Sequence, residues 1–301
     1  MIQKRPLRIA AVTTCHNRRS LTLNALDTLS KQSTTEHIAL QTFLVDDGST
    51  DGTADAVRAR FPAATIIPGN GNLFWNQGMR AGIRKAKQVR PDFFLLFNDD
   101  THFESNALEQ MIRTHRHHLD HGDAGIVVGA IRDPDTGTLA YGGFKQVSNL
   151  NPLKLRKIPH TGSVEMCDTF NMNSVLVSSV VLHRLGNLER RFHHTKGDLE
   201  LGLRAKRKGF RACVTAGYIG SCPHNSYAEV LQDRKKSRWS RFRFLLSLRS
   251  HKPLEQVVLY RRHGGPLWPV FALTPYVDFL LQELGWALGR LCRTLHRTNH
   301  Q

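Results

Sequence analysis

The sequence has few cysteines, and no two of them stand at short spacing. Its five cysteines are scattered over 301 residues without a C-x-x-C motif, and their odd number argues against a disulfide framework. A small domain held together by disulfides is therefore excluded, and a reducing cytosol is the simplest compartment. The first residues also lack the hydrophobic core of a signal peptide, so we expect a cytoplasmic protein.

Long hydrophobic runs are also absent. The most apolar stretch, residues 268–291, is interrupted by prolines and charged residues, so it lacks the ~20 apolar residues of a membrane span. Because it contains tryptophan and tyrosine and has flanking arginines, it suits a helix that lies on an anionic bilayer surface. A C-terminal helix that packs on the domain or at a subunit contact fits the same pattern equally well.

Acidic residues are scarce relative to basic ones. The chain has 25 Asp and Glu against 42 Lys and Arg, which gives a net charge of +17. Residues 233–301 hold thirteen basic and four acidic residues, a surplus of nine, which is about half of the total. Such a surplus can serve nucleic acid, an anionic membrane or an anionic substrate. Helix-turn-helix, zinc-finger and aromatic-basic RNA motifs are all missing, so we expect no nucleic-acid partner.

What the chain does contain is a run of five apolar residues, 93–97, that ends in Asn98, Asp99 and Asp100. An uninterrupted apolar run of this length predicts a strand buried on both faces, as in the middle of a mostly parallel sheet. Ligands bind at the carboxyl ends of such strands, where two adjacent carboxylates can hold a hard divalent cation. An aspartate that caps the next helix would explain the same residues.

Two earlier segments repeat this arrangement. Residues 7–14 and 40–45 predict buried strands with a helix between them, which together form a right-handed βαβ unit. The second strand ends in D-D-G-S-T-D-G-T, residues 46–53. An ordinary strand-to-helix turn would account for the two glycines and the capping residues. The turn nevertheless places three more carboxylates at the edge that carries Asp99 and Asp100.

A third strand at 65–67 leads into G-N-G-N-L-F-W-N, residues 69–76. Glycines let the backbone approach a ligand closely, and asparagine side chains, including that of Asn76, can bond sugar or ribose hydroxyls. A plain loop before a core helix is the alternative.

Four histidines near the next predicted helix resemble a metal cluster, but most would project into solvent, so we favour a solvated helix face. These histidines are His115, His117, His118 and His121.

The second half of the chain does not continue the alternation of predicted strands and helices. Residues 126–141 predict a hairpin, and residues 144–162, rich in Asn, Lys and Pro, predict a mobile loop. A helix is expected to begin at Asp198, with acids in its first turn and bases in its last, which suits the helix dipole. Asp198 is either a structural residue of this helix or a general base that points into the cleft. His224 lies in a polar loop, where a lone histidine is more often structural than a ligand.

Four motifs together resemble family 2 glycosyltransferases of the GT-A fold. They are T-T-C-H-N-R, V-D-D-G-S-T-D-G-T, N-D-D and G-D-L-E-L-G-L-R-A-K-R-K-G, in this order and spacing. The stretch G-N-G-N-L-F-W-N-Q-G-M further resembles the bacterial rhamnosyltransferase-like branch. The resemblance covers residues 7–226 and implies an α/β fold, in which a Rossmann-like, mostly parallel central sheet is flanked by helices.

The same resemblance implies a domain organisation. Residues 1–226 are expected to form the glycosyltransferase domain, with a nucleotide-sugar-binding half at 7–124 and an acceptor and catalytic half at 125–226. Residues 227–301 lie outside it and are expected to form a basic, amphipathic helical tail.

The resemblance also assigns roles to single residues. It implies that Asp100 holds Mg²⁺ or Mn²⁺ against the donor diphosphate, with His224 as a weaker candidate, and that Asp198 is the catalytic base. The residues implied to bind the nucleobase, ribose or sugar are Thr14, Asn17, Asp47 and Asp99. The family's second acidic motif reads Glu-Asp, and here Gly197 replaces the Glu, which leaves that role open unless Glu200 substitutes for it.

The expected function is that of an inverting, metal-dependent glycosyltransferase. It would move a sugar from a nucleotide-diphosphate sugar to a hydroxyl of a cell-surface glycan or lipid-linked acceptor, as a peripheral protein at the inner face of the plasma membrane. A cation neutralises the leaving diphosphate, and a single carboxylate base implies direct displacement with inversion. Because Gly197 departs from the pattern, a non-catalytic nucleotide-sugar- or glycan-binding partner of a polysaccharide assembly complex is the alternative. A nucleotidyltransferase would carry a glycine-rich loop where C-H-N-R stands.

Overall fold

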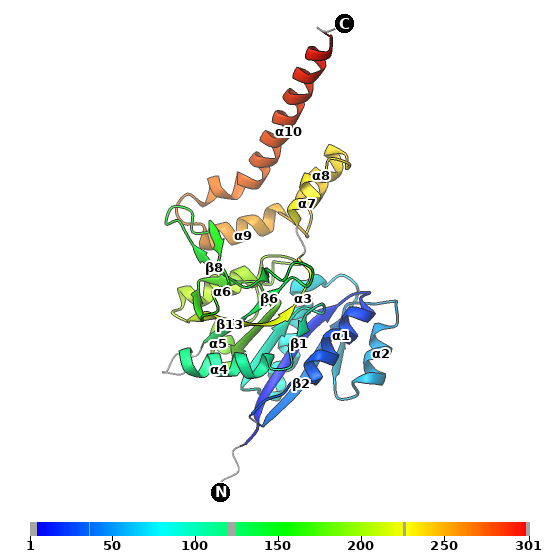
Figure 1. Ribbon diagram of the computed structural model, residues 1–301, viewed down its shortest axis with the longest axis vertical. Coiled ribbons are helices and arrows are strands. Elements are labelled where there is room, and N and C mark those ends of the chain that lie inside the picture. The colour runs from blue at the N-terminus through cyan, green and yellow to red at the C-terminus, as the bar shows by residue number, and fades with distance from the viewer. Residues whose placement is uncertain (1–4, 36, 120–124, 225–226, 299–301) are drawn as a thin grey trace. The chain divides into compact units, whose positions relative to one another are not determined.

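The structure is a computed structural model that describes residues 5–35, 37–119, 125–224 and 227–298. Its internal contacts divide the chain into two units. Unit 1 comprises residues 1–147 and 155–224, and unit 2 comprises residues 148–154 and 225–301. Figure 1 shows the elements of both units with their labels.

Unit 1 is built on a mostly parallel sheet, as the sequence predicts. Its main strands follow the order β10-β13-β6-β12-β4-β1-β2-β3, and the short strands β5 and β7 pair with β13 and β6. Strands β1 to β4 pair in parallel, whereas β12 lies antiparallel between β4 and β6. The bounds are β1 Leu7–Cys15, β2 Ile38–Asp46, β3 Thr65–Pro68, β4 Phe93–Phe97, β5 His102–Phe103, β6 Ile126–Arg132, β7 Leu139–Tyr141, β10 Glu165–Cys167, β12 Ser174–Ser178 and β13 Ala212–Ser221.

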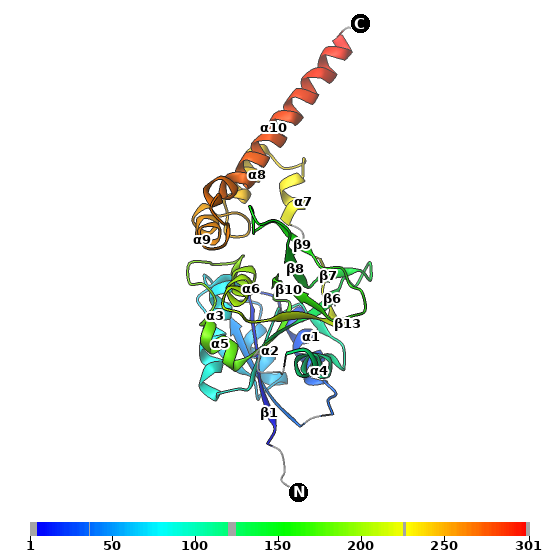
Figure 2. The ribbon, with the colours of Figure 1, turned by 90° about the vertical axis from the view of Figure 1, so that its left-hand side faces the viewer.

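Helices cover both faces of this sheet. One face carries α3 (Phe74–Ala86), α5 (Ser179–Leu185) and α6 (Gly197–Arg207). The other face carries α1 (Arg19–Ser30), α2 (Thr53–Arg60) and α4 (Ala107–Leu119). In Figure 2, α5 and α6 lie on one side of the sheet and α4 lies on the other. The result is two hydrophobic cores that share the sheet between them.

Strand β4 contributes to both cores. Phe94 and Leu96 face one core, Leu95 and Phe97 face the other, and all four side chains are fully buried. A strand that is covered on both sides needs an apolar residue at every position, because successive side chains point to opposite faces. The predicted buried strand at 93–97 is therefore confirmed, and the two carboxylates that follow it stand at its carboxyl end.

The histidines of α4 do not form a metal cluster among the described residues. His115 is buried, and its ring packs edge-on against Phe93 with 4.8 Å between the ring centroids. His117 is exposed, as expected of the solvated face. The side chain of His118 and the whole of His121 lie outside the described part of the chain.

The expectation of one continuous loop at 144–162 is wrong. Strands β8 (Gly143–Gln146) and β9 (Leu155–Lys157) join β11 (Thr169–Phe170) in a second, antiparallel sheet of order β11-β8-β9. Strands of three or four residues carry too little periodicity to outweigh the Asn, Lys and Pro around them. The turn between β8 and β9, residues 148–154, belongs to unit 2.

Unit 2 is largely helical where it is described. Its helices are α7 (Tyr227–Gln232), α8 (Arg238–Leu245), α9 (Pro253–His263) and α10 (Trp268–Thr298). The 148–154 turn packs beside the link between α9 and α10, because Pro152 Cδ lies 3.3 Å from the place that a Cβ on Gly265 would take. Among the described helices, none is both long enough and apolar enough to cross a membrane.

Candidate active site

The carboxyl ends of β1, β2 and β4 meet at one edge of the sheet. In the register of these parallel strands, Cys15 at the end of β1 pairs with Asp46 at the end of β2. Asn98, just after β4, donates its backbone N–H to the carbonyl of Asn173, which precedes β12 (3.2 Å). Residues from four strands therefore gather at the edge where ligands bind in open α/β sheets.

A single guanidinium bridges the two carboxylates that follow β4. Arg18 Nη1 donates to Asp99 Oδ1 at 3.0 Å, and Arg18 Nη2 donates to Asp100 Oδ2 at 2.7 Å. Both aspartates are buried, whereas the Arg18 side chain is 39% exposed. The other oxygen of Asp100 accepts a hydrogen bond from the Cys222 thiol, which follows β13 (3.3 Å). Carboxylates buried this far need such partners, because an unpaired buried charge is costly.

Sequence reasoning did not identify Arg18 as a site residue. The signal for it was the arginine of C-H-N-R, which follows β1 at the edge where the carboxylates collect. Local pattern alone could not connect it to its partners, because these lie 81 and 82 positions further along the chain.

Burial governs the charge of Asp99. Loss of hydration raises the pKa of Asp99 to about 7, while Arg18 lowers it and the neighbouring Asp100 raises it. The ionisation of Asp99 near neutral pH therefore depends on a cation beside it. Burial also holds the pKa of the Cys222 thiol far above its usual range, so this thiol is a neutral hydrogen-bond donor to Asp100.

Asp47 anchors the loop that follows β3. Its Oδ1 accepts the backbone N–H of Gly71 (2.8 Å), and its Oδ2 accepts that of Phe74 (2.9 Å). Position 69 favours glycine because a Cβ on Gly69 would lie 2.6 Å from Asp47 Oδ1. The carboxylate that is predicted to receive the nucleobase therefore fixes the glycine-rich loop against the β2 turn. Its contact with a nucleobase stays a prediction.

Thr14 and Asn17 differ in exposure. Thr14 is buried, and its hydroxyl donates to the carbonyl of Val45 on β2 (3.2 Å). Asn17 is exposed, and its Oδ1 accepts the backbone N–H of Thr50 (2.7 Å). Asn17 thus ties the β1 loop to the β2 loop at the surface, where a donor can reach it.

Backbone strain gathers around the same edge. Asn17, Phe74 and Lys196 all have left-handed backbones, with φ of 51°, 53° and 72°. A side chain in this region costs about 1–2 kcal/mol relative to ordinary backbone. Such residues persist where the surrounding structure holds them, and they concentrate at functional sites. Here Asn17 lies in the C-H-N-R motif, Phe74 lies in the glycine-rich stretch 69–76, and Lys196 precedes Gly197 and Asp198.

Asp198 lies in the first turn of α6. Its Oδ1 accepts the backbone N–H of Leu199 (2.8 Å), and the backbone of Met172 and the side chain of Asn171 also bond to the carboxylate. Burial raises the pKa of Asp198, and these hydrogen bonds only partly offset the effect. A carboxylate with a raised pKa is suited to take a proton.

The segment 171–173 connects Asp198 to the acidic edge. Its first two residues bond to Asp198, and the carbonyl of its third, Asn173, accepts the Asn98 N–H and the Thr101 hydroxyl. The Asn173 amide also donates to Cys222 Sγ at 3.5 Å. Three consecutive residues therefore join the predicted base to the edge that carries Asp99 and the predicted metal ligand Asp100.

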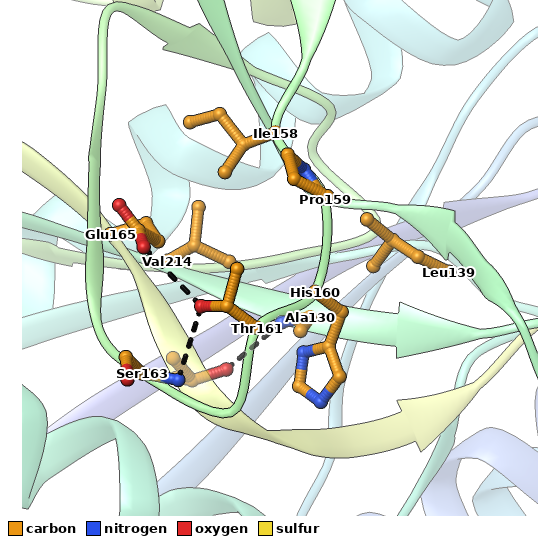
Figure 3. A pocket seen from close by; sticks show the side chains of 10 residues that line it. Ala130, Leu139, Ile158, Pro159, His160, Thr161, Ser163, Glu165 and Val214 are labelled. Atoms are coloured by element: carbon orange, nitrogen blue, oxygen red, sulfur yellow. Dashed lines mark hydrogen bonds between the residues drawn. The ribbon is translucent and has the colours of Figure 1, made fainter.

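None of these residues lines the pocket that Figure 3 shows. That pocket lies between the 158–165 segment and strands β6 and β13 (Figure 3). His160, which lines it, stacks its ring on Tyr218 with 4.0 Å between the ring centroids. Its free volume of about 10 Å³ is that of a single water molecule, so a nucleotide sugar does not fit.

The sequence matches a known protein family. A family model, described as glycosyl transferase family 2, matches residues 10–180, which is more than half of the 301 residues. This chain belongs to glycosyl transferase family 2. The match ends before Asp198, so it covers the first three motifs but not the fourth. No curated protein matches the sequence.

Solved structures share the fold of this family 2 glycosyltransferase. The mannosyltransferase PcManGT from Pyrobaculum calidifontis, in complex with GDP-Man and Mn²⁺, has a TM-score of 0.54. It is 16% identical, and the likeness covers 97% of this chain and 81% of that one. TarS 1–349 of S. aureus has a TM-score of 0.52 at 12% identity, over 84% of this chain and 69% of its own. These likenesses concern the fold, and they confirm the expected α/β architecture of the GT-A glycosyltransferases.

In this family 2 glycosyltransferase, Asn76 occupies the space beside Gly197. Asn76 is fully buried, and its Nδ2 donates to the carbonyls of Glu189 (2.9 Å) and Phe192 (2.7 Å). A Cβ on Gly197 would overlap Asn76 Oδ1. Gly197 departs from the family's Glu-Asp motif, and the Asn76 side chain occupies the space that a side chain at position 197 would fill. The predicted role of Asn76 in donor binding stays a prediction.

We expect Gly197→Ala to lower the free energy of unfolding by about 1–3 kcal/mol, as overpacked cores do. The loss should appear although alanine favours a helix by about 1 kcal/mol over glycine. Urea unfolding of Gly197→Ala, Asn76→Ala and the double variant measures it. Asn76→Ala should itself cost about 1–3 kcal/mol, because the carbonyls of Glu189 and Phe192 each lose one of their donors. The double variant should be more stable than the sum of the two losses predicts, whereas strict additivity would contradict the matched pair.

Glu200 is part of the packing of α6. It is fully buried, and its Oε2 accepts from Arg204 Nε (3.1 Å) and Nη2 (2.9 Å). Arg204 also donates to the carbonyls of Leu185 and Asn187, so the pair ties α6 to the end of α5. Glu200 is thus engaged in a structural ion pair, and its substitution for the missing Glu stays a prediction.

His224, the weaker metal candidate, is held by contacts with Asp133 and Tyr141, and its role as a metal ligand stays a prediction. Its backbone N–H donates to Asp133 Oδ2 (2.9 Å), and its ring stacks on Tyr141 with 5.7 Å between centroids. Within the described part of the chain, no group of three or more His, Cys, Asp or Glu is arranged to hold a metal ion.

The residues that could hold a cation are the adjacent pair Asp99 and Asp100. They offer buried carboxylate oxygens at a place that already carries the positive charge of Arg18. Mg²⁺ is commonly held by one or two carboxylates and completes its shell with water and substrate phosphates. The pair therefore fits a cation that arrives with a nucleotide.

Proposed function

We propose that this protein is an inverting glycosyltransferase that uses a nucleotide-diphosphate sugar and a divalent cation. One observation carries the proposal: the segment 171–173 joins the partly buried Asp198 to the edge that bears Asp99 and Asp100. Sugar transfer from a diphosphate to a hydroxyl needs a proton acceptor beside a diphosphate-binding edge. Structures of the same fold support the donor class, because PcManGT is in complex with GDP-Man and Mn²⁺ and TarS with UDP-GlcNAc.

The acidic edge receives the donor diphosphate in this proposal. Asp99 and Asp100 hold Mg²⁺ or Mn²⁺, which when bound neutralises the charge of the leaving diphosphate. Arg18 is partly exposed, so it can leave the carboxylates to the cation and turn its guanidinium toward the phosphates. The nucleoside lies over the β1 and β2 loops, where Asn17 is exposed and Asp47 fixes the glycine-rich loop.

Asp198 takes the proton of the acceptor hydroxyl in this proposal. General-base catalysis of this kind contributes ~10²–10⁴-fold. Glu200 is held by Arg204, so Asp198 acts alone on α6, and a single displacement inverts the anomeric carbon. The sugar is a hexose or deoxyhexose, in keeping with the rhamnosyltransferase-like sequence, and the acceptor is a cell-surface glycan or a lipid-linked precursor on the cytoplasmic side of the plasma membrane.

Nucleotide release from a panel of UDP-, GDP- and dTDP-sugars tests the proposal. With a supplied lipid-linked acceptor, we expect release from one donor in Mn²⁺ or Mg²⁺, and none in EDTA. Asp100→Ala should abolish release, whereas Asp135→Ala, which removes an exposed turn carboxylate, should retain it. Release that survives both EDTA and Asp100→Ala would contradict the metal-dependent mechanism. Tight nucleotide binding without release from any donor would favour a non-catalytic binding partner.

A further inference from the structure

Helix α10 has one side buried in unit 2 and an exposed apolar side opposite it. On one side, Ala272, Phe279 and Glu283 are buried against the rest of unit 2. The other side carries a row of aliphatic residues that are between 47% and 64% exposed, which we call the α10 ridge. The ridge consists of Val270, Leu273, Val277, Leu280, Leu281, Leu284 and Leu288. Their spacing of three and four residues places them on one helix face, although they have no partner among the described residues.

An ion cluster around the buried Glu283 fixes which side of α10 faces outward. Glu283 accepts hydrogen bonds from Arg234 (2.6 Å), Arg238 (3.1 Å) and Arg241 (2.6 and 3.0 Å). Arg241 is itself buried, and its guanidinium lies over the ring of Phe279 at 5.8 Å. Rotating α10 to hide the ridge would bury leucines but would expose or unpair this cluster, which is costly. The ridge is therefore held in solvent by the packing on the opposite face.

The exposed charges of unit 2 are almost all positive. Among its acidic side chains whose exposure is described, Asp278 alone is exposed. The exposed basic residues are Lys154, Arg234, Lys235, Lys236, Arg238, Arg243, Arg249, Arg261 and Arg262. Two copies of this unit would bring like charges together if their ridges paired, which disfavours a homodimer. An anionic surface gains from the same charges.

We propose that the α10 ridge and the basic residues of unit 2 form a docking surface for an anionic lipid bilayer. The ridge spans 18 steps from Val270 to Leu288, or roughly 27 Å at the helical rise. A helix of this kind lies in the plane of the membrane, with its apolar face among the upper acyl chains and basic side chains at the headgroups. The inference rests on unit 2 alone, so it holds independently of the chemistry proposed for unit 1.

Vesicle flotation of the full chain tests this surface with a matched pair of neighbouring substitutions. Leu281→Glu places a charge on the ridge, and Gln282→Glu places the same charge on the exposed polar flank. We expect the natural chain to float with phosphatidylcholine–phosphatidylglycerol vesicles and not with phosphatidylcholine alone. Leu281→Glu should lower the partition coefficient by roughly tenfold or more, and Gln282→Glu should change it little. Added salt should weaken the binding.

Two results would overturn the proposal. One is equal binding of Leu281→Glu and Gln282→Glu to anionic vesicles. The other is a natural chain that is dimeric by light scattering, ignores vesicles and becomes monomeric in Leu281→Glu, because the ridge is then a contact between copies. Matching thermal unfolding curves for the two variants control for folding. Nucleotide release with a soluble acceptor separates a failure of docking from a failure of the proposed chemistry.

Discussion

Asp198→Asn is expected to lower the turnover number of sugar transfer by ~10²–10⁴-fold while donor binding stays within about twofold. The amide keeps an oxygen that can accept the backbone N–H of Leu199, so the first turn of α6 should keep its shape. What the amide lacks is the ability to take a proton from the acceptor. Single-turnover rates measure the first effect, and calorimetric titration of the donor nucleotide measures the second. A variant that keeps more than about a tenth of the natural rate would remove Asp198 from the role of base.

The raised pKa of Asp198 gives this prediction a pH dependence with a definite sign. Burial moves the pKa above the value of 3.8 that a solvated Asp has, and the base must be ionised to act. The rate should therefore rise with pH on an acid limb that lies higher than a solvated Asp would place it. Because folding favours the protonated form, the stabilising contribution is complete below the unfolded pKa and is lost as pH rises through the folded pKa. The stability of Asp198→Asn relative to the natural chain should thus increase over that interval.

Arg18→Met is expected to make the stability of the protein depend on Mn²⁺. Without the guanidinium, two adjacent buried carboxylates lose their cation, which should cost about 2–3 kcal/mol in EDTA. The cost stays below the ~3–5 kcal/mol of a fully buried pair, because the Arg18 side chain is 39% exposed. Mn²⁺ should restore most of the loss, since it binds the folded carboxylates in place of Arg18.

Thermal unfolding in EDTA and in Mn²⁺, without nucleotide, measures this dependence. Arg19→Met is the matched control, because it removes the next arginine, whose backbone N–H bonds to Asp51. In the described structure Asp99 and Asp100 pair with Arg18 and not with the Arg19 side chain. The Mn²⁺-induced rise in melting temperature should be several degrees larger in Arg18→Met than in Arg19→Met or the natural chain. Equal shifts in all three proteins would show that Arg18 does not compete with a cation for Asp99 and Asp100.

The sequence predicted the sheet and its acidic edge because their signals are local. The run 93–97 is apolar at every position, and this pattern is typical of a strand that is covered on both faces. The polar residues after each strand then fall at one edge by topology alone. The sequence alone therefore predicts that Asp99, Asp100, Asp47 and Asn17 lie near one another.

What the sequence could not supply was contact between distant side chains. The bridge from Arg18 to Asp99 and the overlap of Asn76 with position 197 each join residues many positions apart. No periodic pattern of apolar and polar residues predicts such a pair of contacts. The short strands β8 and β9 were missed for a related reason, because they are held by pairing with each other and with β11 rather than by their own propensity.

The position of the 148–154 turn affects the order in which this protein can fold during translation. Unit 2 contains this turn as well as residues 225–301, so the chain passes between the two units three times. During translation, the 70 residues from 155 to 224 leave the ribosome after the turn and before its helical partners. The turn can therefore pack beside Gly265 only after α9 and α10 have been synthesised. A protein truncated after residue 226 would lack α9 and α10, so the 148–154 turn would lose the residues against which it packs. A stable shorter protein therefore needs a redesigned turn as well as a new stop codon.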